Sequence, residues 1–96
     1  MKESRSPDEV CRDYATRSIK LTCRMLDDET ILLEGPPETL EFLGELLLAQ
    51  AHFQRDCGFQ FGPRYAGKAL FSAESTHGIY IHRLPCKEAD HRTHQR

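Results

Sequence analysis

The chain has 96 residues, and its 13 Lys and Arg against 15 Asp and Glu give a formal net charge of −2. This length predicts one domain, and the slight negative charge argues against a general nucleic-acid coat protein. The sequence contains neither the apolar run of about 18 residues that a membrane-spanning helix needs nor an apolar stretch near Met1 typical of a secretory signal. We therefore expect a small cytoplasmic protein with no membrane association.

Both ends of the chain are polar. Residues 1–16 hold few apolar side chains, so we expect them to be mostly disordered, with Val10 and Tyr14 as docking points. Residues 87–96 contain a single Ala and no other apolar side chain, which predicts a disordered polar tail. A single folded domain over residues 17–86 remains.

The first part of this domain reads as a β-hairpin. Residues 18–26 alternate apolar and polar side chains, and residues 30–34 form a second short apolar segment. With a turn at residues 27–29, Met25 pairs with Ile31, and Cys23 pairs with Leu33. The apolar side chains then share one face, which we expect to be buried in the core.

A helix is predicted over residues 37–53, after Gly35 and Pro36 end the second strand. Its wide apolar face consists of Leu40, Phe42, Leu43, Leu46 and Leu47. Leu48 lies among the glutamates instead and is expected to be exposed. Gln50 interrupts the apolar face. Either this turn extends beyond the edge of the sheet, or Gln50 presents a polar group to a pocket or a partner.

Strands are predicted again after the helix, over residues 57–61, 69–73 and 79–84, with a glycine-containing loop at 62–67. The order strand, strand, helix, strand, strand is typical of an α+β domain. We expect a two-layer fold in which one helix packs on a largely antiparallel sheet of three or four strands.

Residues 59–68 interleave aromatic and basic side chains directly after an acidic helix. Residues 36–54 carry three negative charges and no positive charge, whereas residues 55–68 carry three positive charges and one negative charge. Aromatic residues and Arg are the usual anchors of protein interfaces. The predicted contact residues for a protein partner are Phe61, Arg64, Tyr65 and Lys68, with His77 beside them if the two loops converge.

Two alternatives remain for this segment. The same residues suit an anion, a nucleotide or a single-stranded nucleic acid, because bases stack on aromatic rings and phosphates attract Arg and Lys. Phe59 and Phe61, at alternating positions, also suit the core beneath the helix.

No catalytic motif has the required spacing. Residues 62–68 match the pattern G-x-x-x-x-G-K, but Ala69 follows where a phosphate-binding loop needs Ser or Thr for Mg²⁺. The residue types of a hydrolytic triad occur without a G-x-S-x-G elbow, at Ser72, Glu74, Ser75, His77 and His82. We therefore expect no enzymatic activity and no cofactor.

The four cysteines include no C-x₂-C pair. They are Cys11, Cys23, Cys57 and Cys86. We expect them to be reduced, in keeping with a cytoplasmic protein, and we expect no bound metal. The nearest metal-ligand sets in the sequence are Cys86 with His91 and His94, and His77 with His82 and Cys86.

Two segments carry a resemblance to a known family. Residues 31–51 (ILLEGPPETLEFLGELLLAQA) and 79–85 (IYIHRLP) resemble small bacterial immunity proteins of polymorphic toxin systems. The shared features are Gly35, the helix over 40–47 and the closing strand over 79–83, whereas residues 55–77 do not match. The resemblance implies a non-enzymatic protein that blocks a toxin by binding it. We expect a protein partner, no nucleic-acid partner, and a monomer or weak homodimer.

Overall fold

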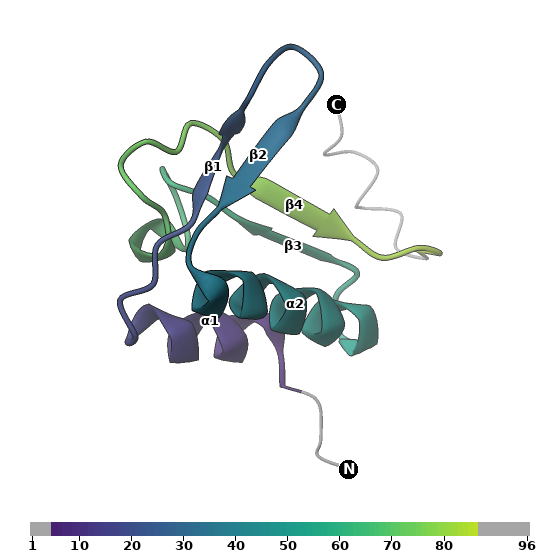
Figure 1. Cartoon of the computed structure of the whole chain (residues 1–96). Coiled ribbons are helices and arrows are strands. Elements are labelled where there is room, and N and C mark those ends of the chain that lie inside the picture. Colours follow the sequence, from purple (N-terminus) through teal and green to yellow (C-terminus); the bar gives the residue numbers. More distant parts are fainter. Residues whose placement is uncertain (1–4, 87–96) are drawn as a thin grey trace.

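The computed structural model describes residues 5–86, so the predicted polar tail at 87–96 lies outside the described residues. The elements are α1 (Pro7–Ala15), β1 (Thr22–Met25), β2 (Ile31–Glu34), α2 (Pro37–His52), β3 (Gly58–Phe61), the 3₁₀ turn η1 (Lys68–Leu70) and β4 (Ile79–His82). The two helices lie side by side beneath the strands (Figure 1). The predicted α+β class is therefore confirmed, with two helices in place of one. No helix in residues 5–86 has both the length and the apolarity needed to cross a bilayer.

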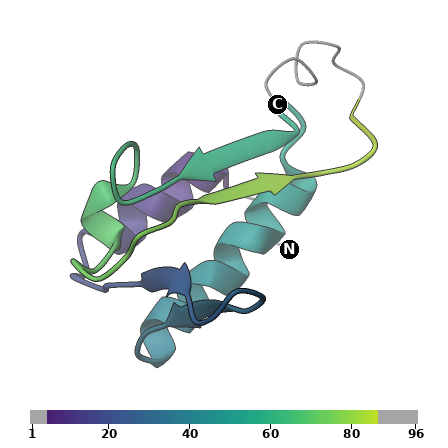
Figure 2. The same cartoon turned by 90° about the horizontal axis from the view of Figure 1, so that it is seen from above.

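The strands form two separate antiparallel pairs, β1–β2 and β3–β4, and not the predicted sheet of three or four strands. Seen from above, the two pairs lie apart (Figure 2). The register of the first pair is as predicted, with Cys23 opposite Leu33 and Met25 opposite Ile31. In the second pair, Phe59 lies opposite Ile81.

The single sheet fails because the outer edge of β1 is occupied by the segment that leads to β4. Leu21 forms a parallel bridge with Phe71, and the Cys23 carbonyl accepts hydrogen bonds from the amides of Thr76 and His77. The predicted strand over 69–73 is reduced to this one bridge. Residues 68–70 form η1 instead, after Gly67 takes a left-handed conformation with φ of 91°.

The prediction of disorder over residues 1–16 is wrong for residues 7–15, which form α1. A capping box starts the helix: the Ser6 hydroxyl accepts from the Glu9 amide at 3.1 Å, and the Glu9 carboxylate accepts from the Ser6 amide at 2.9 Å. Val10 and Tyr14 are the predicted docking points, and both are buried. The prediction failed because it relied on the small number of apolar residues and ignored their spacing. Val10 and Tyr14 are four residues apart and therefore lie on one face of a helix.

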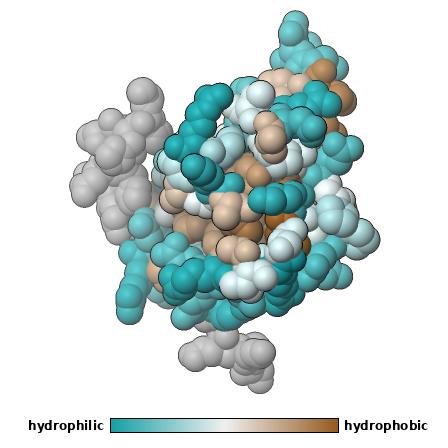
Figure 3. Space-filling model, turned by 90° about the vertical axis from the view of Figure 1, so that its left-hand side faces the viewer, coloured by the Kyte–Doolittle hydropathy of each residue, from teal (hydrophilic) through white to brown (hydrophobic). Residues whose placement is uncertain are grey.

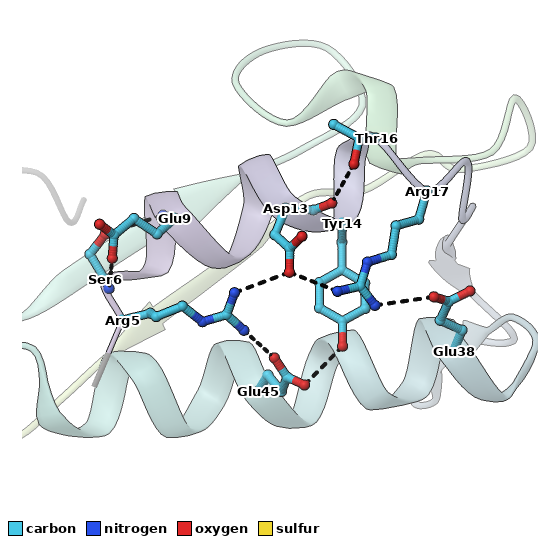
Figure 4. Close-up of polar contacts among 9 residues, drawn as sticks. All are labelled: Arg5, Ser6, Glu9, Asp13, Tyr14, Thr16, Arg17, Glu38 and Glu45. Carbon is cyan, nitrogen blue, oxygen red and sulfur yellow. Dashed lines mark hydrogen bonds and ion pairs between the residues drawn. The ribbon is translucent and has the colours of Figure 1, made fainter. Parts of the chain in front are cut away.

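Polar contacts join α1 to the acidic side of α2 (Figure 4). The Tyr14 hydroxyl donates to Glu45 at 2.9 Å, and the Arg17 guanidinium lies 4.1 Å from the centre of the Tyr14 ring. The ion pairs are Arg5–Asp13, Arg5–Glu45, Arg17–Asp13 and Arg17–Glu38. Hydrogen bonding to Arg5 and the nearby charge of Arg17 lower the pKa of Asp13. The acidic face of α2 is thus partly neutralised by the N-terminal segment.

The buried face of α2 differs from the predicted one. It consists of Thr39, Phe42, Leu46, Ala49 and Gln50. Leu40 and Leu47 were expected in the core but are exposed, because they lie on the flank opposite the glutamates that face α1. Leu48 is 64% exposed, as predicted.

The C-terminal end of α2 is closed by a side chain from the end of β4. Nη1 of Arg83 donates to the carbonyls of Gln50 at 3.0 Å, Phe53 at 2.7 Å and Asp56 at 3.3 Å. The side chain of Gln50 is buried and donates to the Asp56 carbonyl at 3.3 Å. Gln50 therefore lies inside the fold and not beyond a sheet edge.

Candidate functional site

The five predicted contact residues do not form one surface. Phe61 is only 1% exposed, and its ring lies 5.3 Å from that of Phe71 and 6.0 Å from that of Phe42. Its assignment as a contact residue is wrong, because it fills the centre of the core, which was the alternative interpretation. Arg64 and Lys68 are exposed.

The loop at 62–67 and the segment before β4 do converge, through Tyr65. A Cβ atom added at Gly78 would collide with the Tyr65 hydroxyl, and one added at Gly62 would lie 2.5 Å from the same ring. The Tyr65 ring therefore packs between two glycines that have no side chains to exclude it. His77 precedes Gly78 but lines a different groove from Arg64 and Lys68.

Arg64 and Lys68 belong to a basic groove of about 630 Å³. Its lining is Lys20, Pro63, Arg64, Lys68, Phe71, Ser72, Ala73 and Ser75. Three cations and no acidic residue line it, which favours an anionic ligand. On the side of the molecule shown in Figure 3, apolar residues at the centre are surrounded by hydrophilic ones.

Ser72 and Ser75, two of the residues whose types would suit a hydrolytic triad, make structural contacts instead. The Ser75 hydroxyl accepts from the Cys23 amide and donates to the Leu21 carbonyl, each at 3.0 Å. Ser72 lies 2.6 Å from the Thr22 hydroxyl. These bonds fasten the edge of β1 to the segment after η1.

A second groove, of about 300 Å³, lies between the β1–β2 hairpin and the start of β4; we call it the apolar groove. Its lining is Cys23, Met25, Ile31, Leu33, His77, Gly78, Ile79 and Tyr80. Ile31 is 61% exposed and Tyr80 is 48% exposed. The apolar side chains of the hairpin share one face as predicted, and Cys23 is buried as expected, whereas Ile31 and Leu33 on β2 are exposed. The β3–β4 pair forms a separate sheet, which leaves these two side chains uncovered.

A third candidate site is a cluster of metal-ligand side chains. It contains Cys57, His82 and Cys86, whose ligand atoms lie within 4.8 Å of one another. The sequence sets included His82 and Cys86 but missed Cys57, which is 25 residues from His82. Pairing the two predicted strands in antiparallel register would have been the signal for it. His91 and His94 lie outside the described residues.

Cys11 lies away from this cluster. Burial, and to a smaller extent the negative charge of Asp8, raise the pKa of its thiol to about 12, so Cys11 is poorly suited to bind a metal ion.

Comparison with known proteins gives no family assignment: no protein-family model, no curated protein and no solved structure matches this chain.

Proposed function

We propose that the protein is a non-enzymatic interaction module whose apolar groove binds an extended apolar segment of a partner protein. The observation that carries this proposal is the exposure of Ile31, Leu33 and Tyr80 around one groove. Contiguous exposed apolar surface is unfavourable in water and commonly marks an interaction site.

The strand pairing supports an extended occupant. Within residues 5–86, β2 pairs only with β1, and β4 pairs only with β3. Each of these strands therefore keeps an edge on which a partner strand can form backbone hydrogen bonds. The lining contains no Asp, Glu, Lys or Arg, so it favours apolar side chains over charged ones. If the resemblance to immunity proteins holds, the partner is a toxin.

The double substitution Ile31→Thr/Leu33→Thr on β2 should abolish capture of the partner from a lysate of the source cells. It removes apolar contacts in the apolar groove but keeps β-branched side chains that suit a strand. The measurement compares proteins retained by wild type and variant at low and high salt, with identification by mass spectrometry. A partner held by apolar contacts stays bound at high salt.

Leu48→Gln is the matched control, because Leu48 is a more exposed apolar residue outside the apolar groove. The control should retain the same protein as wild type, and circular dichroism should show all three chains folded. Equal capture by the Ile31→Thr/Leu33→Thr variant contradicts the proposal. If the lysate yields only a second copy of this chain, the occupant of the apolar groove is that copy, and the protein forms a homodimer through this face.

The basic groove supports a second candidate function, binding of an anion or a single-stranded nucleic acid. Lys20, Arg64 and Lys68 line it without an acidic neighbour in the lining, although Lys20 also donates to the Ala69 carbonyl at 2.9 Å. Phosphate binding by three cations releases counterions and therefore weakens with salt.

For this candidate we expect the affinity for a fluorescent single-stranded oligothymidine to fall about 20-fold between 50 and 200 mM salt. This is the salt dependence of about three phosphate contacts to a single strand. Arg64→Ala/Lys68→Ala should remove most of the binding measured by fluorescence anisotropy. Arg55→Ala removes an exposed cation outside the groove and should leave binding unchanged. Salt-independent binding, or equal losses in both variants, would exclude the basic groove as the site.

A further inference from the structure

Three side chains that metals favour meet at one end of the β3–β4 pair. The Sγ atom of Cys57 lies 3.4 Å from Nε2 of His82, and the ligand atoms of Cys57, His82 and Cys86 all lie within 4.8 Å of one another. Cys57 is buried, and the other two are half-buried. The cluster combines two thiols with one imidazole, and both ligand types suit Zn²⁺.

The backbone holds this cluster in place. Gly58 pairs with His82 in the β3–β4 register, and the Arg83 amide donates to the Cys57 carbonyl at 2.7 Å. Cys57 and His82 are therefore fixed side by side by strand pairing. Cys86 comes from the short segment after β4, four residues beyond His82. The three ligands therefore come from the residue before β3, the last residue of β4 and the segment that follows it.

The spacing fits tetrahedral coordination. Zinc bonds of about 2.3 Å to sulfur and about 2.0 Å to nitrogen place the two ligand atoms about 3.5 Å apart in a tetrahedral site. The observed separation of 3.4 Å between Cys57 Sγ and His82 Nε2 is close to this value. Cys57 and His82 therefore need to move little to bind one ion, and Cys86 lies near enough to join them, with its ligand atom within 4.8 Å of both.

A neighbouring ring orients the imidazole. Tyr80 stacks on His82 with ring centres 5.9 Å apart and planes 16° from parallel. Gly58 allows this arrangement, because a Cβ atom there would collide with the Tyr80 hydroxyl. The stacked ring restricts rotation of the imidazole, a restraint that outer-shell hydrogen bonds provide in many other metal sites.

We propose that Cys57, His82 and Cys86 bind one Zn²⁺ ion, which fastens the segment after β4 to the start of β3. Both thiols lose their protons to solvent when the ion binds, and the neutral imidazole donates its Nε2 lone pair. The three side chains leave one tetrahedral position for a fourth donor. Tyr80 lies in the apolar groove and also stacks on His82, but this proposal does not depend on the proposed partner binding, because its test uses metal alone.

The experiment is a titration of the reduced, metal-free full-length chain with Co²⁺, followed by displacement with Zn²⁺. We expect one equivalent of Co²⁺ to give the thiolate charge-transfer absorption and the intense visible bands of a tetrahedral site. Cys86→Ser and His82→Gln should each weaken Zn²⁺ affinity at least about 100-fold in competition with a chromophoric chelator. Zn²⁺ should raise the melting temperature of wild type but not of Cys86→Ser.

His77→Ala and Cys11→Ser are matched controls, because both residues lie outside the cluster. Both should bind Zn²⁺ as wild type does. Cys86 and His82 are half-buried, so their variants are expected to fold, and circular dichroism of the metal-free chains checks this. The proposal is overturned by the absence of cobalt–thiolate absorption in the reduced wild type, or by absorption of equal intensity and Zn²⁺ affinity equal to wild type in Cys86→Ser. A Cys57–Cys86 disulfide that, once reduced, binds no metal also overturns it.

Discussion

Replacing Phe61 with Ala is expected to lower the free energy of unfolding by about 3–5 kcal/mol, the usual cost of removing a buried aromatic ring. The Phe61 ring contacts the rings of Phe42, Phe59 and Phe71, so its loss opens a cavity between α2, β3 and the residue after η1. A domain of this size is stable by only about 5–15 kcal/mol. Thermal unfolding followed by circular dichroism should therefore show a decrease in melting temperature of more than about 12 °C.

Phe61→Leu is the matched variant, because it keeps an apolar side chain of similar reach. We expect it to cost less than half as much as Phe61→Ala, since much of the cavity is filled. A melting temperature for Phe61→Ala within a few degrees of wild type would contradict the core assignment. Loss of partner binding with unchanged stability would instead return Phe61 to the contact surface that the sequence suggested.

Local patterns in the sequence predicted local structure well. The alternation around Cys23 and the short turn after Leu26 were enough to place Met25 opposite Ile31, because a shift of one residue would mix the two faces. The two prolines after Gly35 placed the start of α2 correctly. Leu48 was correctly expected to be exposed, since it lies on the charged side of the helix.

What the sequence did not predict depends on contacts between distant segments. Alternation identifies a strand but not its neighbour, so it did not reveal that Thr76 and His77 would occupy the edge of β1. The same limit applies to Phe61, whose position between basic residues suggested a surface although its ring enters the core. The helix over residues 7–15 is a different case, because Ser6 and Glu9 form a capping box that is visible in the local sequence, and low apolar content was given more weight than this signal.

The candidate sites follow from these long-range contacts. The apolar groove exists because the strands form two pairs and leave the face of Ile31 and Leu33 partly uncovered. Cys57 joins His82 only through the β3–β4 register, which no spacing rule along the chain contains. The residue types at both sites were visible in the sequence, whereas their proximity depended on which strands pair.

The second large effect is expected at Arg83. Arg83→Met should lower the free energy of unfolding by about 2 kcal/mol, because hydrogen bonds from a charged donor are stronger than neutral ones. The variant keeps the aliphatic stem but leaves the carbonyls of Gln50, Phe53 and Asp56 without the guanidinium. It also removes a positive charge from the negative end of the α2 dipole. Urea unfolding measures the change.

Two further variants separate the causes at Arg83. Arg83→Lys retains the charge and three donors, so it should lose less stability than Arg83→Met if charge and hydrogen bonding dominate. Arg64→Met removes an exposed guanidinium and should change stability by no more than about 0.5 kcal/mol. Equal effects of Arg83→Met and Arg64→Met would show that the three carbonyls gain nothing from Arg83. A loss of stability in Arg83→Met alone instead establishes that the residue after β4 stabilises the C-terminal end of α2. The segment that follows this end of the helix leads to Cys57 and β3.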